Sequence, residues 1–406
     1  MKILFLTSHF CQERDANGVC VYNVSQSFLK MSHSIYVIES SYSDSFTPKD
    51  IDGIKVYGVK EGLFKIAQRS FNKKKRNKYE ELLFRVFHFL RNCVALPFFP
   101  KNNPFRIKKI QKLATRLVKD EGIDIVVATY MPYDALAAGK KMKQKDPSLT
   151  VFAYHLDVLG ESHNSNSFIR GFKRRRLRRF FSKEIRVFDR VFLPMSESNE
   201  GYVDNNKIKC LEFPMYIKPN DFINIEGLPF DDEHIDISYV GSLDSDNRNP
   251  KELFKLIERI NEERGDAIRV HIWGKIEDQA IVSIINSFKF VTHHGYIGTE
   301  MIPSLLSKSD FLLNMANKNS SKMIPSKIFL LFAAGKPIID WVQSSDDVSI
   351  EYFTRSKNSL LLFSWKNSNL KEQLEHFLFS KNIIESNDLA FYDCTPDYVA
   401  SRLVEN

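Results

Sequence analysis

The sequence predicts an α/β protein of two doubly wound domains, each a mostly parallel sheet covered by helices. Short buried strands alternate with helices along both halves of the chain, as parallel sheets with helical crossover connections require. The length of 406 residues suits two domains of ordinary size. A polar stretch marked by prolines separates the two strand–helix series.

The first series begins at the N-terminus. Residues 2–7 are apolar, but the run is too short for a signal peptide and lacks a small-residue cleavage site, which favours a buried strand. Residues 123–129 form another clear buried run. The strands expected in this half are 2–7, 34–39, 53–59, 123–129, 150–154 and 191–194, and the helices are 18–30 and 134–144.

The pattern breaks after residues 207–213 into a stretch of prolines, a glycine and acids. We therefore expect a first domain at 1–214, a linker at 215–230 and a second domain at 231–394. The final helix, 395–406, is expected to pack back on the first domain. The second series comprises strands 235–241, 268–273, 291–294 and 311–315 and helices 250–262, 301–307 and 396–404.

The composition is that of an ordinary soluble globular protein, with 43% hydrophobic and 27% charged residues. No apolar run reaches the roughly 18 residues that a membrane-spanning helix needs. The five cysteines are odd in number and have no metal-ligand spacing, which indicates reduced thiols and a cytoplasmic protein. Two doubly wound domains predict a ligand in the cleft between them, and the absence of a Gly-x-Gly-x-x-Gly after any strand disfavours NAD or FAD.

The segment 323–339 is the most informative about function. Pro325 suits a first helical turn, Gly335 suits a left-handed helix end, and a buried strand follows. A helix start with unpaired N–H groups and Lys327 beside them would bind an anion. The alternative is a helix that only packs.

This segment, which reads Pro-Ser-Lys-Ile-Phe-Leu-Leu-Phe-Ala-Ala-Gly-Lys-Pro, resembles the nucleotide-sugar-binding helix of family 4 glycosyltransferases with the GT-B fold. The resemblance implies a GT-B enzyme whose donor site includes Ser326 and Lys327. Two positions depart from the family pattern, because its two glutamates correspond to Lys322 and Leu330. The second glutamate grips the donor ribose in the family, so its loss puts donor affinity in doubt.

Other motifs extend the resemblance over nearly the whole chain. Gly18 corresponds to a glycine of the loop after the first strand, where the backbone approaches the donor. His155 and Asp157 follow the strand 150–154 and correspond to residues that line the cleft near the donor sugar, so they are the catalytic candidates. A capping aspartate and a half-buried histidine are the alternative reading.

In the second half, Gly241 ends a strand, and Ser242 occupies the place of a family arginine that holds the pyrophosphate. Arg248 or Lys251 could supply that charge, and we favour Arg248. The remaining candidates for the donor site lie at other strand ends: Gly274, Gly295, Tyr296, which would cover the base, and Asn314. Adjacent histidines at 293 and 294 point to opposite faces of a strand, so no metal site is expected.

Two basic runs could bind nucleic acid, bind anionic lipid or be merely solvated. Residues 65–78 hold seven Lys or Arg and no acid, and residues 172–190 hold nine against two acids. Residues 79–100 are rich in aromatics and read either as an interfacial element or as a core helix. We expect an anionic membrane surface and no nucleic acid, with these contacts: Lys73, Lys74, Lys75, Arg76, Arg174, Arg175 and Arg176.

Together these features predict a cytoplasmic enzyme, peripheral on the plasma membrane, that acts in cell-surface polysaccharide synthesis. It would move a sugar from a nucleotide diphosphate to a saccharide or lipid-linked acceptor, with retention and without a metal or other cofactor. The alternatives are a nucleotide-sugar epimerase or hydrolase on the same fold and a donor-impaired scaffold subunit.

Overall fold

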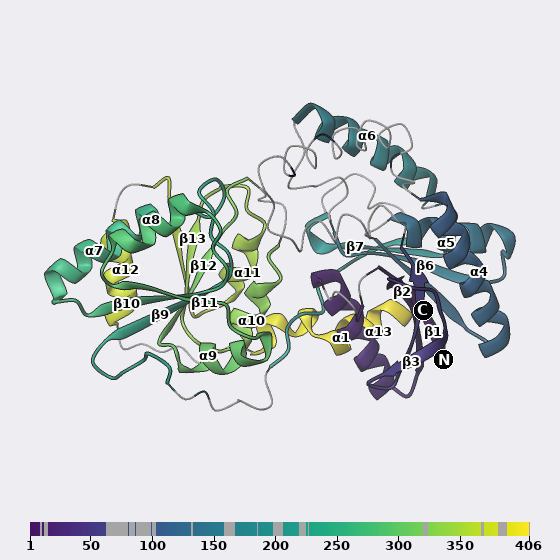
Figure 1. Ribbon diagram of the computed structural model, residues 1–406, viewed down its shortest axis with the longest axis horizontal. Helices are drawn as coiled ribbons and strands as arrows, with labels where there is room; N and C mark the ends of the chain where they lie inside the picture. The colour runs from purple at the N-terminus through teal and green to yellow at the C-terminus, as the bar shows by residue number, and fades with distance from the viewer. Residues whose placement is uncertain are drawn as a thin grey trace. The chain divides into compact units, whose positions relative to one another are not determined.

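The chain divides into two compact units, Met1–Pro214 with Pro396–Asn406, and Met215–Thr395. The structure is a computed structural model (Figure 1). It describes residues 1–8, 10–11, 15–61, 80, 86, 99, 103–130, 133–157, 167–184, 186–197, 206–218, 225, 227–319, 324–366, 369–380 and 388–405.

The first unit contains an eight-stranded sheet in the order β3-β4-β2-β1-β5-β6-β7-β8. All neighbouring strands pair parallel except β3 and β4, which are antiparallel. The strands are β1 (Lys2–Leu6), β2 (Ser34–Ser41), β3 (Ser45–Ile51), β4 (Ile54–Lys60), β5 (Ile125–Tyr130), β6 (Thr150–His155), β7 (Arg190–Pro194) and β8 (Ile208–Leu211).

Helices cover both faces of this sheet. The apolar sides of α4 (Pro104–Glu121), α5 (Tyr133–Lys145) and α6 (Ser167–Glu184) share one hydrophobic cluster with one face of the sheet. Phe5 points to the other face, where its ring lies 6.3 Å from that of Phe28 on α1 (Ala16–Lys30). The C-terminal helix α13 (Pro396–Val404) packs against α1, and Ser27 donates a hydrogen bond to Asp397 over 2.5 Å. A short 3₁₀ helix, η2, spans Met195–Glu197.

The second unit contains a six-stranded parallel sheet in the order β11-β10-β9-β12-β13-β14. One face packs on α7, α8 and α12 through a second hydrophobic cluster. The strands are β9 (Ile235–Val240), β10 (Ile268–Trp273), β11 (Val291–Gly295), β12 (Phe311–Met315), β13 (Ile338–Val342) and β14 (Ser359–Phe363). The helices are α7 (Lys251–Arg264), α8 (Gln279–Ser287), η3 (Thr299–Met301), α9 (Ile302–Lys308), α10 (Lys327–Ala333), α11 (Ser349–Arg355), α12 (Leu370–Phe379) and η4 (Asp388–Cys394).

The predicted fold class is confirmed, since both sheets are doubly wound and almost wholly parallel. The sequence reasoning missed β3, whose residues are mostly exposed and include Pro48, so it lacks an apolar alternation. It also missed α4 and α6, whose faces carry many cations. Within the part of the chain that the structure describes, no helix is long and apolar enough to cross a membrane.

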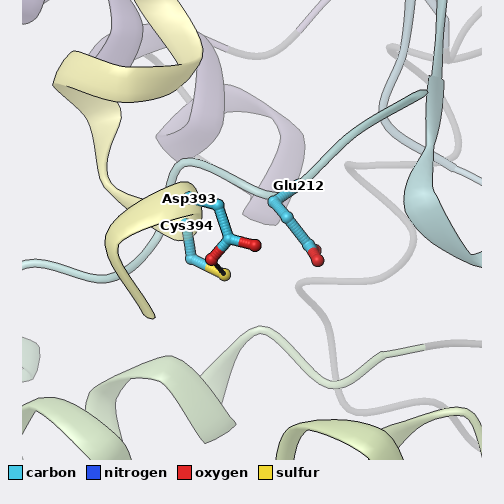
Figure 2. Close-up of side chains that lie close together, drawn as sticks. All are labelled: Glu212, Asp393 and Cys394. Atoms are coloured by element: carbon cyan, nitrogen blue, oxygen red, sulfur yellow. Dashed lines mark hydrogen bonds between the residues drawn. The ribbon is translucent and has the colours of Figure 1, made fainter. Parts of the chain in front are cut away.

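The stretch expected to be a linker begins within the second unit. The N–H groups of Met215 and Tyr216 both donate to the carbonyl of Cys394, over 3.1 and 3.0 Å, which ties the stretch to η4. The Cys394 thiol lies 3.6 Å from the carboxylate of Asp393 (Figure 2). Glu212, also drawn there, belongs to the first unit, and we assign no metal site to these side chains.

Candidate functional site

Three glycines end adjacent strands at the carboxyl edge of the second sheet. The N–H of Gly241 donates to Trp273 O over 2.8 Å, and the N–H of Gly274 donates to Gly295 O over 2.7 Å. All three have positive φ, at 146°, 149° and 79° in chain order. A Cβ on Gly274 would lie 2.2 Å from the carbonyl oxygen of Gly241. The backbone of Gly274 can therefore approach that of Gly241 this closely only because Gly274 has no side chain.

Lys327 lies directly on this backbone. Its ammonium donates to the Tyr239 hydroxyl over 3.0 Å and to Val240 O over 3.1 Å, and it lies 4.3 Å from the centre of the Tyr239 ring. A Cβ on Gly241 would be 2.6 Å from the Lys327 Nζ. Burial lowers the pKa of Lys327 well below its ordinary value, and the charge of Arg248 acts in the same direction.

Arg248 brings a second cation to the same place. Its guanidinium Nε donates to Asn317 Oδ1 over 2.8 Å, and Asn247 Nδ2 donates to the same oxygen over 3.1 Å. Burial raises the pKa of Tyr239 to about 12, an effect that the nearby Arg248 opposes. Among the described residues, neither Arg248 nor Lys327 forms an ion pair with a carboxylate. Two basic side chains held close without an ion-paired carboxylate make a site that an anion would stabilise.

The helix that carries Lys327 differs from the expected one. It begins at Lys327 rather than near Pro325 and has seven residues. The N–H of Ile328 donates to Pro325 O over 3.1 Å, and the side chain of Ser326 makes no capping hydrogen bond. The prediction of free first-turn amides is therefore wrong for Ile328. An anion at this site would be held by the side chains of Lys327 and Arg248. Gly335 has the expected left-handed conformation, with φ of 70°.

The other candidates in the second unit are not all brought together. Tyr296 follows Gly295 and is 78% exposed, so it is accessible to a ligand. Leu330 is partly buried on α10, and Ser326 is exposed. Lys322 lies outside the described residues.

Asn314 is fully buried rather than displayed at the edge of the sheet, which contradicts its expected place in the donor site. It precedes the last residue of β12, and its amide donates to Asp340 Oδ1 of the neighbouring strand over 2.8 Å. Both side chains are fully buried. Burial raises the pKa of Asp340 to about 8, and the charge of Asp347 acts in the same direction. The pair therefore belongs to the interior of the unit.

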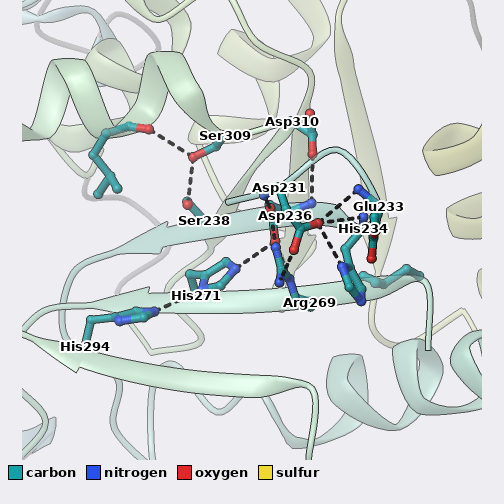
Figure 3. Close-up of polar contacts among 12 residues, drawn as sticks. Asp231, Glu233, His234, Asp236, Ser238, Arg269, His271, His294, Ser309 and Asp310 are labelled. Atoms are coloured by element: carbon teal, nitrogen blue, oxygen red, sulfur yellow. Dashed lines mark hydrogen bonds and ion pairs between the residues drawn. The ribbon is translucent and has the colours of Figure 1, made fainter. Parts of the chain in front are cut away.

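A polar network that the sequence reasoning missed crosses β9, β10 and β11 (Figure 3). Arg269 holds both carboxylate oxygens of Asp236, each over 2.8 Å. His271 bridges Asp236 Oδ1, at 2.8 Å, and His294 Nε2, at 2.9 Å. Burial lowers the pKa of both histidines, that of His294 to about 4. Both imidazoles are thus neutral at pH 7, and the charged members of the network, Arg269 and Asp236, neutralise each other in an ion pair that joins β9 to β10.

The histidines also fix the ends of the strands that bear the glycines. The ring of His294 stacks on Trp273, with centroids 4.1 Å apart. His293 Nε2 lies 2.7 Å from the carbonyl oxygen of Gly274. The two adjacent histidines therefore have different partners, as their opposite faces on a strand imply.

In the first unit, His155 ends β6, but it is 3% exposed and lies between the rings of Tyr130 and Phe181, at 5.1 and 5.2 Å. Burial lowers its pKa to about 3. It is therefore neutral at pH 7. The burial of its ring contradicts the expectation that His155 lines a cleft.

Asp157 lies just beyond β6 and is partly buried. Its Oδ2 accepts a hydrogen bond from Asn17 Nδ2 over 2.6 Å, which joins it to the start of α1. Gly18 is inside α1 rather than in a loop, and its N–H donates to Asp15 Oδ1 over 2.8 Å. That amide is therefore used by a helix cap, which contradicts the expected approach of a ligand to Gly18.

Of the expected membrane contacts, Arg175 is exposed on α6 and Arg176 is partly buried. Outside the described residues lie the side chains of Lys73, Lys74, Lys75, Arg76 and Arg174, and most of residues 79–100.

No protein-family model and no curated protein sequence matches the chain. Solved structures do match over its whole length. An OtsA apo structure aligns with a TM-score of 0.62 at 9% identity, covering 100% of this chain and 98% of that one. WaaG, a glycosyltransferase involved in lipopolysaccharide biosynthesis, aligns with a TM-score of 0.55 at 10% identity, covering 100% of both chains.

The chain has the GT-B fold. A UDP-GlcNAc 2-epimerase from Methanocaldococcus jannaschii also aligns, with a TM-score of 0.56 at 12% identity, covering 100% of this chain and 98% of that one. At these identities the likeness establishes the GT-B fold alone. The residues around Gly241 must therefore carry any argument about activity.

Gly274→Ala should disrupt the strand ends, because its Cβ would meet a backbone oxygen that cannot move aside. Gly265→Ala is the matched control, since Gly265 also has a positive φ of 73° but nothing within 4 Å of an added Cβ. Replacing a left-handed glycine costs about 1–2 kcal/mol by conformation alone. Urea unfolding should show a clearly larger loss for Gly274→Ala, and equal losses would contradict the close contact.

The free energy of unfolding should fall as the pH rises from about 4 to about 8, because of Asp340. In the folded chain its carboxyl keeps a proton up to about pH 8, whereas in the unfolded chain it ionises near its ordinary value of about 3.9. Between these values the unfolded state alone loses a proton, so the free energy of unfolding decreases as the pH rises. Asp340→Asn should flatten this dependence between pH 5 and pH 8 in denaturant titrations. An unchanged slope would mean that Asp340 is ionised when folded.

Proposed function

We propose that this protein is a glycosyltransferase that uses a nucleotide-diphosphate sugar as donor. The observation that carries the proposal is the pair of basic side chains, Lys327 and Arg248, at the backbone of Gly241. A pyrophosphate would supply a charged partner, since neither side chain forms an ion pair among the described residues. At Gly295 nothing lies within 4 Å of an added Cβ, so no side chain would hinder a ligand there.

The proposed reaction breaks the bond between the anomeric carbon of the sugar and the donor's phosphate oxygen. A new bond then forms to a hydroxyl of a saccharide or lipid-linked acceptor, with retention of configuration. Negative charge grows on the departing diphosphate, where Lys327 and Arg248 would stabilise it. The leaving phosphate oxygen can take the acceptor's proton, so no side-chain base is assigned. The proposal gives His155 no role as an acid, because burial lowers its pKa to about 3.

The lowered pKa of Lys327 fits this role. A buried amine beside a guanidinium tends to lose its proton, and a bound diphosphate would favour the charged form. Donor binding would then be coupled to proton uptake by the site. The proposal includes no metal or other cofactor, because the two side-chain cations stand where a metal would otherwise neutralise the leaving group.

The proposed setting is cell-surface polysaccharide synthesis at the cytoplasmic face of the plasma membrane. A lipid-linked acceptor would be reached from that face, which agrees with the basic runs of the first unit. Tyr296, exposed next to Gly295, is proposed to cover the nucleotide base.

Lys327→Ala should weaken binding of a nucleoside diphosphate by about 1.5–3 kcal/mol, the scale of a charged hydrogen bond. Calorimetry with UDP, GDP and ADP would measure it. Lys336→Ala is the control, since Lys336 lies beyond the other end of α10. An unchanged affinity would remove Lys327 from the site. A donor-hydrolysis screen over common nucleotide sugars would then test the activity itself.

Two other functions have specific support. The alignment with a UDP-GlcNAc 2-epimerase favours an epimerase or hydrolase, which would isomerise or release the donor sugar without an acceptor. Leu330, in place of the family's ribose-binding glutamate, favours a donor-impaired scaffold subunit.

Leu330→Glu should tighten nucleoside diphosphate binding, because a carboxylate on α10 would hydrogen-bond the ribose hydroxyls. Calorimetry of the variant beside the parent chain measures this. Leu330→Gln is the matched control for the change in shape. Weaker binding in a variant that is still folded, judged by circular dichroism, would count against a ribose lying at this position.

A further inference from the structure

The net charge of the chain is divided very unevenly between its units. Met1–Pro214 with Pro396–Asn406 holds 39 Lys and Arg against 24 Asp and Glu, a net charge of +15. Met215–Thr395 holds 19 against 26, a net charge of −7. The overall value of +8 therefore hides a strongly basic first unit.

Three helices carry a large share of this positive charge. Together α4, α5 and α6 contain 18 Lys and Arg against four Asp and Glu, a net charge of +14. Their apolar sides share one hydrophobic cluster with one face of the sheet, which α6 joins through Leu177 and Phe181. We call these three helices the basic layer. The other face of this sheet is covered by α1 and lies on the opposite side from the basic layer.

The cations of the basic layer point outward in rows. Exposed side chains recur along α4 and, at steps of four residues, along α6. They are Lys108, Lys112 and Lys119 on α4, and Arg175, Arg179 and Lys183 on α6. A hollow of about 380 Å³ lies along α6, lined by Gly171, Arg175, Arg178, Arg179 and Ser182. Its size and its arginines suit a phosphate-bearing headgroup.

Exposed aromatic side chains lie near the starts of α4 and α6. Phe105 on α4 is 84% exposed, and Phe172 on α6 is 45% exposed. The side chain of the neighbouring Arg106 donates hydrogen bonds to Ser8, which lies just after β1, and to Ser40, near the end of β2. Both serines lie at the carboxyl edge of the sheet. Phe105 therefore lies at this edge, where doubly wound sheets bind their ligands.

We propose that the basic layer is the surface by which this protein docks on an anionic lipid bilayer. Cations over three helices would contact the headgroups, and Phe105 and Phe172 would enter the interface. This combination of cations with exposed phenylalanines favours a bilayer over a nucleic acid. The inference extends the proposed function by naming the partner on its acceptor side, but it rests on unit 1 alone and not on the donor site.

The test is sedimentation of the full chain with vesicles of phosphatidylglycerol or of phosphatidylcholine. Binding is expected to the anionic vesicles only and to weaken as salt rises. The triple variants K108Q/K112Q/K119Q and R175Q/R179Q/K183Q should each bind roughly 100-fold more weakly, since each cation near an anionic surface contributes about fivefold. Phe105→Ser with Phe172→Ser should weaken binding at high salt most.

The matched control is K255Q/R259Q/K289Q, which removes three exposed cations from the second unit. It should bind vesicles like the parent chain. Equal losses in the control and in the basic-layer variants would overturn the proposal, and so would unchanged binding in variants that melt like the parent. Displacement from the vesicles by an equal charge of single-stranded RNA would also overturn it, in favour of nucleic acid. Nucleoside diphosphate affinity, measured on every variant, keeps a failure of the donor site distinct from a failure of docking.

Discussion

The packing of the Lys327 ammonium on the backbone at Gly241 is the contact on which the candidate site depends. It requires a glycine at 241, since a Cβ there would lie 2.6 Å from Nζ. It also requires Tyr239, whose hydroxyl accepts a hydrogen bond from the amine and whose ring centre lies 4.3 Å from it. Gly274 must be a glycine in turn, because a Cβ there would lie 2.2 Å from the carbonyl oxygen of Gly241. Two adjacent strand ends thus meet at Gly241, one through its contact with Lys327 and the other through the backbone.

The sequence could predict the fold because its strands are short, apolar and separated by helices, and this alternation needs no knowledge of tertiary contacts. It could also point to Gly241, Gly274 and Lys327 one by one. It could not reveal that they touch, because their contact depends on the strand order and on where α10 begins. The Asn247–Arg248–Asn317 contacts were hidden for the same reason, since they join loops about 70 residues apart. The Asp- and Asn-rich loop after β9 was their only signal in the sequence.

The wrong expectations share a physical cause. The segment around Gly18 resembled a ligand-binding loop, but Gly18 lies in a helix that Asp15 caps. Its N–H donates to the Asp15 side chain. Asn314 and His155 sit near the ends of strands, where polar residues usually meet solvent. Their burial is set by neighbouring elements, Asp340 in one case and the rings of Tyr130 and Phe181 in the other. A strand position predicts an edge, but not which side chains the rest of the fold will cover.

The cations at the carboxyl edges of the two sheets differ in whether they are paired. In the first unit, Arg106 is buried and paired with Asp134 over 3.1 Å, so a cation at the carboxyl edge is neutralised within the protein. Removing one partner of such a buried pair costs about 3–5 kcal/mol, so Arg106 is committed to Asp134 rather than available to a ligand. In the second unit, Lys327 and Arg248 form no ion pair among the described residues, and burial together with the charge of Arg248 lowers the pKa of Lys327. A bound anion would favour the protonated form of Lys327, whereas a cation that is already paired gains less from an anion. The second unit is therefore where a diphosphate would be held most strongly, while the surface cations of the first are left for a partner outside the chain.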